Sequence, residues 1–270
     1  IKLYSAIWWS RLSQVLPSLM RLTKARHVVL RLSRALKDQG AAFGLSDGRL
    51  LSAKALPEGM SFLENGLRFE VDVLRGQKTG FFLDQRDNRK RVENLSKGKT
   101  VLNAFSYTGG FSLYAARGGA AEVTSLDASR PALAAAQRNF ALNPQINCTH
   151  KVLCGDAFAE MKALIAAEKT YDVVVIDPPS FARKKSEVES ARNAYGRLTK
   201  LGLALLAPGG TLVLASCSSR ISMDDFVAIN QRAASQVNKS LKILERHEHA
   251  IDHPVDFAEG AYLKCVFTTA

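Results

Sequence analysis

From Thr100 onward, short apolar runs alternate with segments of helical periodicity, and this alternation constrains the fold more than any other feature of the 270 residues. We expect strands at residues 100–105, 122–126, 149–153, 171–176 and 210–216, followed by extended runs at 241–244 and 262–268. We expect helices at residues 111–118, 130–142, 157–168, 187–206 and 223–238. Strands that alternate with helices form βαβ units, so the sequence predicts an α/β fold with a Rossmann-like, doubly wound, mostly parallel sheet.

The first 77 residues lack this alternation and predict a separate, small α+β domain. We expect a helix over residues 1–22, a strand over 26–33 and a hairpin over 61–74. Pro17 would kink or end the helix, and Asn65-Gly66 is a strong turn signal because both residues tolerate positive φ. The chain therefore divides into a domain of residues 1–77 and a larger domain of residues 78–270.

Basic residues are concentrated in the first part of the chain, which carries a net charge of +12 overall. Residues 1–100 contain 19 Lys or Arg and 9 Asp or Glu, whereas residues 101–270 contain 18 and 16. This asymmetry indicates a surface that faces a polyanion such as RNA, although a solvated basic face has the same composition.

Cysteine spacing and hydropathy indicate the compartment. The four cysteines, Cys148, Cys154, Cys217 and Cys265, follow neither a disulfide framework nor a zinc pattern, which favours free thiols in a reducing cytoplasm. No apolar run approaches the roughly 18 residues that a membrane span needs. Pro254 would break any helix that could align His247, His249 and His253, and no cysteine or acid completes a tetrahedral set, so we expect no metal. We also expect no membrane partner, and we leave a homodimer open.

The first strand after Thr100 runs into a turn where Gly109 and Gly110 allow the backbone to approach a ligand. Asp127, at the end of the next strand, can accept both ribose hydroxyls of a nucleoside, although it could instead cap a helix. Asp156 can accept the amine of an adenine and Phe158 can flank its ring, but a helix cap is an equal alternative for Asp156. Because no G-x-G-x-x-G loop is present, we expect a nucleoside cofactor without a pyrophosphate.

The fourth and fifth strands bring an acid and a thiol to the same edge of the sheet. Asp177 is followed by Pro178 and Pro179, which fix the loop and leave carbonyls that can accept from a substrate amine. Cys217 follows the fifth strand. A lone cysteine is usually inert packing, but a thiol beside an acid suits covalent attack on a pyrimidine. Cys217 would attack carbon-6 and Asp177 would engage N3, so that carbon-5 can take a methyl group from a sulfonium.

Basic residues follow this loop and provide candidate phosphate contacts, although a solvated helix approach would have the same pattern. They are Arg183, Lys184 and Lys185, with Arg192, Tyr195 and Arg197 further along. We expect substrate to be bound by Pro178, Pro179, Phe181, Arg183, Lys184 and Lys185.

Six strings together carry a resemblance to a known family. They are Gly80-Phe-Phe-Leu-Asp-Gln-Arg-Asp-Asn-Arg89, Asn103-Ala-Phe-Ser-Tyr-Thr-Gly-Gly-Phe111, Asp177-Pro-Pro-Ser-Phe-Ala182, Pro208-Gly-Gly210, Ser216-Cys-Ser218, and Asp252-His-Pro254 with Tyr262-Leu-Lys264. The chain resembles the class I methyltransferases that form 5-methylcytosine in bacterial 23S ribosomal RNA, well over residues 78–266 and loosely over residues 1–77.

The resemblance implies S-adenosylmethionine as cofactor, a methyltransferase domain over residues 78–270, and a first domain that helps to hold RNA. The cofactor would be bound by Gln85, Arg86, Asn103, Phe105, Ser106, Tyr107, Thr108, Gly109, Asp127, Asp156, Phe158 and Asp177. Members of the family often carry an N-terminal PUA domain, so we expect either a truncated chain or weaker RNA docking. Many other RNA cytosine methyltransferases have a second cysteine where Ser180 stands, which leaves open the group that removes the carbon-5 proton.

Three other functions compete with carbon-5 methylation. The Asp-Pro-Pro loop also permits methylation of a base nitrogen, and a methyltransferase scaffold can serve as a non-catalytic RNA-binding protein. A Rossmann oxidoreductase is disfavoured by the missing phosphate loop.

The basic composition of residues 1–100 generates a prediction about salt. If these residues neutralise backbone phosphates, the logarithm of RNA affinity should fall with the logarithm of salt concentration, by about 0.7 for each phosphate on a single strand. Filter binding over a salt series measures this slope, and a flat dependence would remove the polyanion argument.

Overall fold

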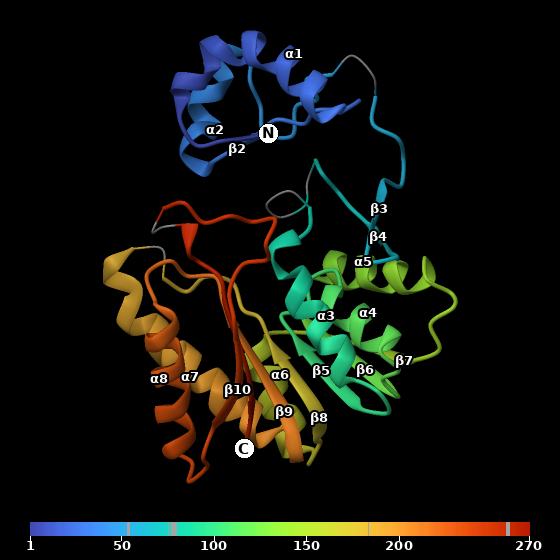
Figure 1. The fold of residues 1–270 in the computed structure, drawn as a ribbon, viewed down its shortest axis with the longest axis vertical. Coiled ribbons are helices and arrows are strands. Elements are labelled where there is room, and N and C mark those ends of the chain that lie inside the picture. Colours follow the sequence, from blue (N-terminus) through green and yellow to red (C-terminus); the bar gives the residue numbers. More distant parts are fainter. Residues whose placement is uncertain (53–54, 75, 77–79, 183, 258–259) are drawn as a thin grey trace. The chain divides into compact units, whose positions relative to one another are not determined.

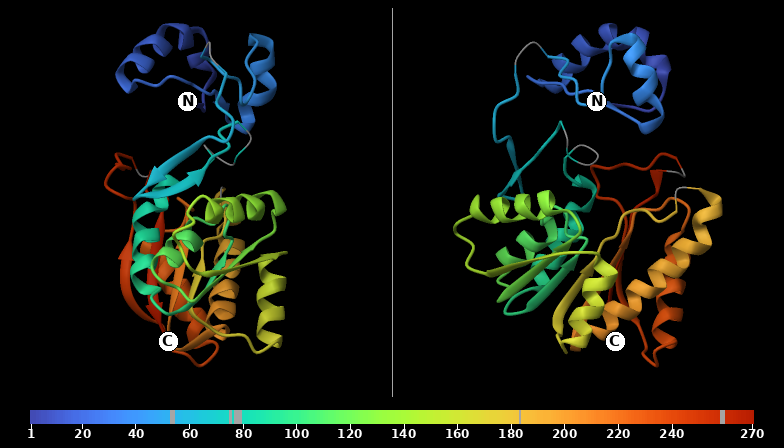
Figure 2. Two further views of the ribbon diagram at one scale, coloured as in Figure 1. Left: turned by 90° about the vertical axis from the view of Figure 1, so that its right-hand side faces the viewer. Right: turned by 180° about the vertical axis from the view of Figure 1, so that it is seen from behind.

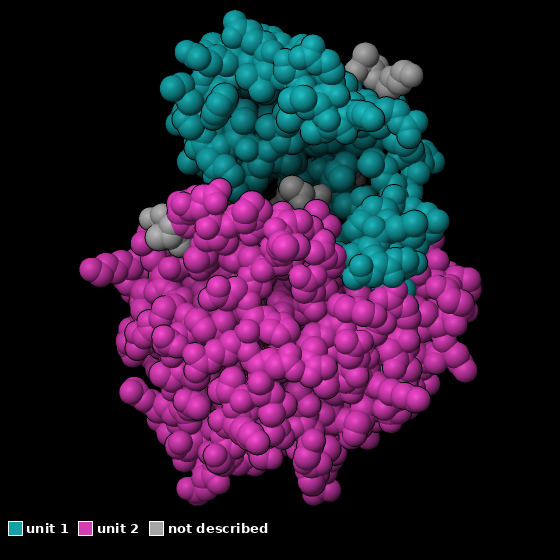
Figure 3. Space-filling view, viewed as in Figure 1, with its two compact units in different colours: residues 1–82 teal, residues 83–270 magenta. Residues whose placement is uncertain are grey.

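The computed structural model describes residues 1–52, 55–74, 76, 80–182, 184–257 and 260–270. It consists of two compact units, unit 1 from Ile1 to Phe82 and unit 2 from Leu83 to Ala270 (Figure 3). The domain division expected after residue 77 stays a prediction.

Unit 2 is built on a seven-stranded sheet with the strand order β10-β11-β9-β8-β5-β6-β7 (Figure 1). The strands are β5 (Thr100–Ala104), β6 (Glu122–Asp127), β7 (Thr149–Cys154), β8 (Tyr171–Ile176), β9 (Leu206–Ser216), β10 (Lys242–His247) and β11 (Lys264–Thr269). Strands β5 to β9 pair in parallel, and β11 is antiparallel to both β9 and β10. The predicted Rossmann-like, mostly parallel sheet is confirmed.

Helices cover both faces of this sheet (Figure 1 and Figure 2). They are α3 (Arg86–Leu95), α4 (Gly110–Arg117), α5 (Arg130–Ala141), α6 (Ala157–Ala166), α7 (Val188–Ala204) and α8 (Met223–Ser235). Side chains alternate along each strand. In β5, Leu102 packs into the core that α6, α7 and α8 cover, whereas Val101 packs against α3 and α4. All helices expected after Thr100 are present, and α3 was not expected.

Strand β9 begins earlier than predicted. The sequence pattern placed its start at Gly210, but the strand runs from Leu206 through the Pro-Gly-Gly segment. Its pairing with β8 shifts register between Tyr171 and Val173, because Tyr171 pairs with Leu206 while Val173 pairs with Thr211. The extra residues are accommodated as an irregularity in the ladder, which does not end the strand.

Unit 1 is a small α+β structure, as the sequence predicted. Its elements are β1 (Lys2–Leu3), a 3-10 turn (Ala6–Arg11), α1 (Leu12–Thr23), β2 (Arg31–Leu32), α2 (Arg34–Gly40), a second 3-10 turn (Ala41–Phe43), β3 (Ser61–Glu64) and β4 (Leu67–Glu70). The expected hairpin is confirmed, with Asn65 and Gly66 at φ 49° and 83°. The strand expected over 26–33 shrinks to Arg31–Leu32, because its partner β1 is only two residues long. Helix α1 continues past Pro17.

No helix in the described part of the chain is long and apolar enough to cross a membrane.

The packing of α7 on the sheet generates a stability prediction. A Cβ at Gly202 would lie 2.7 Å from Leu212 Cδ1 and 2.9 Å from Ile176 Cδ1. We expect Gly202→Val to lower the free energy of unfolding by about 1–3 kcal/mol through overpacking, measured by urea denaturation. Gly196→Ala is the matched control, because its Cβ would make an ordinary 3.6 Å contact and alanine favours the helix. Equal loss in both variants would contradict this account of the packing.

Candidate active site

The strand order of unit 2 reverses between β5 and β8, because the chain moves outward from β5 to β6 and β7 and then returns to β8. Ala104 and Ile176 are register partners at the carboxyl ends of these two strands. The backbone N–H of Asp177 donates to the carbonyl of Ala104 over 3.4 Å. Two segments therefore leave the sheet side by side where ligands of such folds bind: residues 105–109, the cofactor turn, and residues 177–182, the Pro-Pro loop.

The cofactor turn contains three residues in the left-handed backbone region. Phe105, Tyr107 and Gly109 have φ values of 60°, 49° and 77°. This region is costly for residues with a Cβ, and such strain persists only where the surroundings impose it, often at functional sites. Gly109 is also required by space, since a Cβ there would lie 2.9 Å from the Cβ of Ala136 in α5.

Hydrogen bonds from neighbouring elements hold this strained turn. The backbone N–H of Tyr107 donates to Asp127 Oδ2 over 2.8 Å, and the N–H of Ser106 donates to the carbonyl of Leu126 over 2.9 Å. On the other side, Asn139 Nδ2 donates to the carbonyl of Thr108 over 2.8 Å. Asn139 is fully buried in α5 and was not singled out from the sequence. The turn is thus anchored to β6 and α5.

The polar atoms around the turn fit a nucleoside cofactor. Asn103 Oδ1, Ser106 Oγ and Thr108 Oγ1 are buried and have no hydrogen-bond partner among the residues that the structure describes. Buried polar atoms without partners are rare in native proteins, so a polar ligand that satisfies them is physically favoured. Asp127 accepts one backbone N–H on each carboxylate oxygen, and each oxygen retains a lone pair for a ribose hydroxyl.

A chain of buried hydrogen bonds lies behind Asn103. Its Nδ2 donates to Ser112 Oγ over 2.9 Å, Ser112 Oγ lies 2.7 Å from Ser125 Oγ, and Ser125 Oγ lies 2.9 Å from His150 Nε2. Burial lowers the pKa of His150 to about 4, so this imidazole is neutral at pH 7. Its ring stacks on Phe140 with centroids 3.7 Å apart. These hydrogen bonds fix the orientation of the Asn103 side chain.

The adenine site expected at Asp156 and Phe158 lies at the start of α6. Asp156 Oδ1 accepts from the backbone N–H of Ala159 over 3.0 Å, so the residue caps the helix as the alternative interpretation allowed. Phe158 is half-buried and meets Phe105 edge to face, with centroids 6.5 Å apart. The guanidinium of Arg197 lies 4.7 Å from the Phe158 ring centroid. Contacts of Asp156 and Phe158 with adenine stay predictions.

Gln85 and Arg86, expected at the cofactor, begin α3. Gln85 is buried, and its Oε1 accepts from Asn88 Nδ2 over 2.7 Å. Arg86 forms ion pairs with Asp87 and Asp252, which brings together two of the strings that carried the family resemblance. Binding of cofactor by these two residues stays a prediction.

Tyr195 joins the Pro-Pro loop to residues 216–219, the cysteine loop. Ser216 Oγ donates to the Tyr195 hydroxyl over 2.8 Å, and the backbone of Phe181 also hydrogen bonds with this phenol. A second link runs from Ser218 Oγ to the carbonyl of Ala182 over 2.8 Å. The sequence grouped Tyr195 with phosphate contacts, but the side chain is 3% exposed, so it cannot reach a backbone phosphate.

Cys217 lies between these anchored positions. It is half-buried, while its neighbours Ser216 and Ser218 are fully buried. Cys265, by contrast, is sealed in the core, where burial raises its pKa. Burial also raises the pKa of Tyr195 to about 12, and the charges of Cys217 and Asp177 add to this shift. Cys217 and Asp177 are therefore both within electrostatic range of one phenol.

The expected substrate residues follow Asp177 along the chain. Pro178 is buried, Pro179 is exposed, and Phe181 meets Tyr195 edge to face with centroids 5.1 Å apart. Lys184 and Lys185 are exposed, and Arg183 lies outside the described residues. Their contacts with substrate stay predictions.

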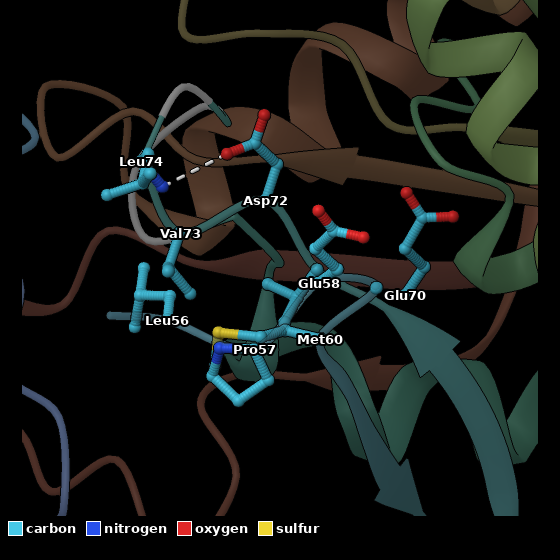
Figure 4. A pocket seen from close by; sticks show the side chains of 10 residues that line it. Leu56, Pro57, Glu58, Met60, Glu70, Asp72, Val73 and Leu74 are labelled. Atoms are coloured by element: carbon cyan, nitrogen blue, oxygen red, sulfur yellow. Dashed lines mark hydrogen bonds between the residues drawn. The ribbon is translucent and has the colours of Figure 1, made fainter. Parts of the chain in front are cut away.

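Unit 1 has a cavity of about 290 Å³, lined by residues 56–60 and 70–74 (Figure 4). Among the described residues that line it, the charged side chains are Glu58, Glu70 and Asp72. This part of the lining is acidic, and negative charge disfavours phosphate. Within the described ranges, no group of three His, Cys, Asp or Glu side chains is arranged to hold a metal ion.

The fold and the turn at the strand reversal define unit 2 as a Rossmann-like domain that binds a nucleoside cofactor. The sequence model of the S-adenosylmethionine-dependent methyltransferases matches residues 11–268, and the chain belongs to this family. The predicted cofactor is thereby confirmed for the family.

Relatives agree with this assignment. A ribosomal RNA large subunit methyltransferase of Deinococcus radiodurans is 49% identical over 267 residues, which are 99% of this chain and 65% of that protein. Ribosomal RNA large subunit methyltransferase I of Vibrio parahaemolyticus is 42% identical over 80% of this chain and 55% of its own length. The chain thus spans less than two thirds of the curated relatives that it matches.

Solved structures are similar as well. A protein described as a methyltransferase, crystallised with SAH, superimposes with a TM-score of 0.84 at 27% identity and covers 99% of this chain and 68% of its own. A protein described as an S-adenosylmethionine-dependent methyltransferase from Streptococcus mutans gives the same TM-score at 26% identity, with the same coverage.

The geometry of the cofactor turn predicts the effect of Gly109→Ala. The methyl group would occupy a left-handed position and press on Ala136, at a cost of about 1–2 kcal/mol for the backbone alone. We expect affinity for S-adenosylmethionine to fall about tenfold in titration calorimetry.

Gly98→Ala is the matched control, because Gly98 has a similar φ of 70° but no atom within 4 Å of a Cβ. It should lose a comparable amount of stability and keep its cofactor affinity. Unchanged affinity in Gly109→Ala would contradict the assignment of the turn.

Proposed function

We propose that this chain transfers a methyl group from S-adenosylmethionine to carbon-5 of a cytosine in large-subunit ribosomal RNA. One observation carries the proposal: Ser216, the neighbour of the half-buried Cys217, is joined through Tyr195 to the loop that starts at Asp177, beside the cofactor turn. The names of the two relatives support the RNA class. Free thiols and an RNA substrate favour action in the cytoplasm.

In this proposal, Asn103, the cofactor turn and Asp127 hold the cofactor through their unpaired polar atoms and carboxylate lone pairs. Gln85, Arg86, Asp156 and Phe158 complete the binding residues. When bound, S-adenosylmethionine supplies an electrophilic methyl group. The chain itself must then make carbon-5 of cytosine nucleophilic.

Cys217 and Asp177 do this by covalent addition. The Cys217 thiolate forms a bond to carbon-6, the carbon-5 to carbon-6 double bond opens, and Asp177 donates a proton at N3. The electron pair displaced onto the ring makes carbon-5 nucleophilic, so that it takes the methyl group. After carbon-5 loses its proton, N3 returns its proton to the Asp177 carboxylate, the bond between sulfur and carbon-6 breaks, and Cys217 leaves as thiolate.

The Pro-Pro loop and the residues after it would hold the base and its backbone. Pro178 and Pro179 present carbonyls that suit the exocyclic amine, and Phe181 lies beside Tyr195. The exposed Lys184 and Lys185 suit phosphates.

Substitution of Cys217 tests the adduct. Cys217→Ala should abolish carbon-5 methylation of ribosomal RNA while calorimetry shows unchanged cofactor affinity, because the side chain is needed only for addition to the base. Asp177→Asn should slow transfer by about 10²–10⁴-fold. Nucleoside mass spectrometry measures the product.

Cys154→Ala is the matched control, because this thiol is exposed at the end of β7 and should leave methylation unchanged. Methylation that survives Cys217→Ala would exclude the adduct and favour transfer to a base nitrogen. Failure of the unaltered chain to bind S-adenosylmethionine would instead favour a non-catalytic RNA-binding role.

A further inference from the structure

Lys264 is a buried lysine next to the cysteine loop. It begins β11 and is the register partner of Ser216 in β9, and its side chain is 2% exposed. Its ammonium donates to the carbonyl of Tyr262 over 2.8 Å and to the carbonyl of Ser218. The residues before and after Cys217 are therefore both joined to Lys264, one through the strand ladder and one through the ammonium.

A buried ammonium is costly unless negative charge or strong acceptors compensate it. The two backbone carbonyls use two of the three N–H donors of Lys264, but they carry no net charge. Two ionisable groups have a favourable charge interaction with it: Cys217, which contributes more, and Glu248. Glu248 is exposed, so water screens its charge. When ionised, Cys217 is a half-buried counter-charge for this ammonium.

We propose that Lys264 is a positioning residue that keeps the sulfur of Cys217 in its thiolate form by presenting a buried positive charge to the cysteine loop. The proposal rests on the proposed function, in which this thiolate attacks carbon-6. A thiol must be ionised to act as a nucleophile, and a nearby cation favours that ionisation.

The other groups near this pair do not replace Lys264. On the β8 side, Asp177 is an acid and supplies no positive charge, and Tyr195 keeps its proton because burial raises its pKa to about 12. On the β10 side, burial lowers the pKa of His249, which is therefore neutral at pH 7. Burial lowers the pKa of Lys264 to about 8, and the Cys217 charge opposes this shift, so the lysine remains mainly an ammonium at neutral pH.

The test measures the reactivity of Cys217 without RNA or cofactor. The unaltered chain, Lys264→Met and Lys264→Gln are alkylated with iodoacetamide over a pH series, and mass spectrometry follows the peptide that contains Cys217. Lys264→Met removes both charge and hydrogen bonds, whereas Lys264→Gln removes the charge and keeps amide donors for the two carbonyls. Lys239→Met is the matched control, because Lys239 also donates to a backbone carbonyl, that of Leu203.

We expect both Lys264 variants to raise the midpoint of the pH–rate profile by about one pH unit, which slows alkylation about tenfold below that midpoint. The Lys239 variant and the exposed Cys154 peptide should react as in the unaltered chain. A normal profile in Lys264→Gln overturns the proposal, because hydrogen bonding alone would then suffice. A normal profile in both variants overturns it equally.

Failure of the proposed role of Lys264 can be distinguished from failure of the proposed function. If Cys217→Ala retains carbon-5 methylation, the adduct is excluded whatever the alkylation profile shows. If Cys217 is essential but its alkylation does not depend on Lys264, only the role of the lysine is excluded. Should Lys264→Met fail to fold, Lys264→Gln decides, because it keeps hydrogen-bond donors for the buried carbonyls.

Discussion

The pairing of β5 with β8 is the constraint on which the rest of unit 2 depends. These strands are adjacent in the sheet although two other strands and three helices separate them in the chain. Their pairing places Asp177 next to Ala104, the last residue of β5. The cofactor turn and the Pro-Pro loop therefore leave the sheet at the same carboxyl edge. Strand β9 follows on the far side of β8 and adds Cys217. The cofactor turn, the Pro-Pro loop and the cysteine loop are each short, and the rigid strands before them fix their positions.

The sequence predicted those parts of the site that depend on local pattern. Buried parallel strands appear as apolar runs, and residues directly after such runs must lie at the carboxyl edge. Asp127 ends a strand, Asp177 and Cys217 directly follow strands, and Gly109 lies in the turn after one, so the edge that they share could be inferred from the sequence. The hairpin of unit 1 could also be predicted from local sequence, because Asn65 and Gly66 together favour a tight turn.

Other features depend on contacts between distant segments, and no local signal marks them. Asn139 resembles an ordinary polar residue of a helix, and only its burial beside the cofactor turn distinguishes it. Lys264 belongs to a string of the family resemblance, but its burial beside the cysteine loop, on which the proposed role rests, has no local signal. Tyr195 lay in a basic stretch and was assigned to the surface, but its ring is in the core. Helix α3 was missed because Val92 is its only fully buried apolar residue, and ion pairs such as Glu93 with Arg117 tie it to α4.

The phenol of Tyr195 also has a geometric consequence for substrate choice. It hydrogen bonds with Ser216 at the end of β9 on one side and with the backbone of Phe181 in the Pro-Pro loop on the other, so it joins the two segments that carry Cys217 and Asp177. Carbon-6 and N3 of a pyrimidine are a fixed span apart within one six-membered ring. Under the proposed chemistry, the two ends of this span meet the thiol and the acid, and because cytosine and uracil share the ring, the exocyclic group at carbon-4 must distinguish them.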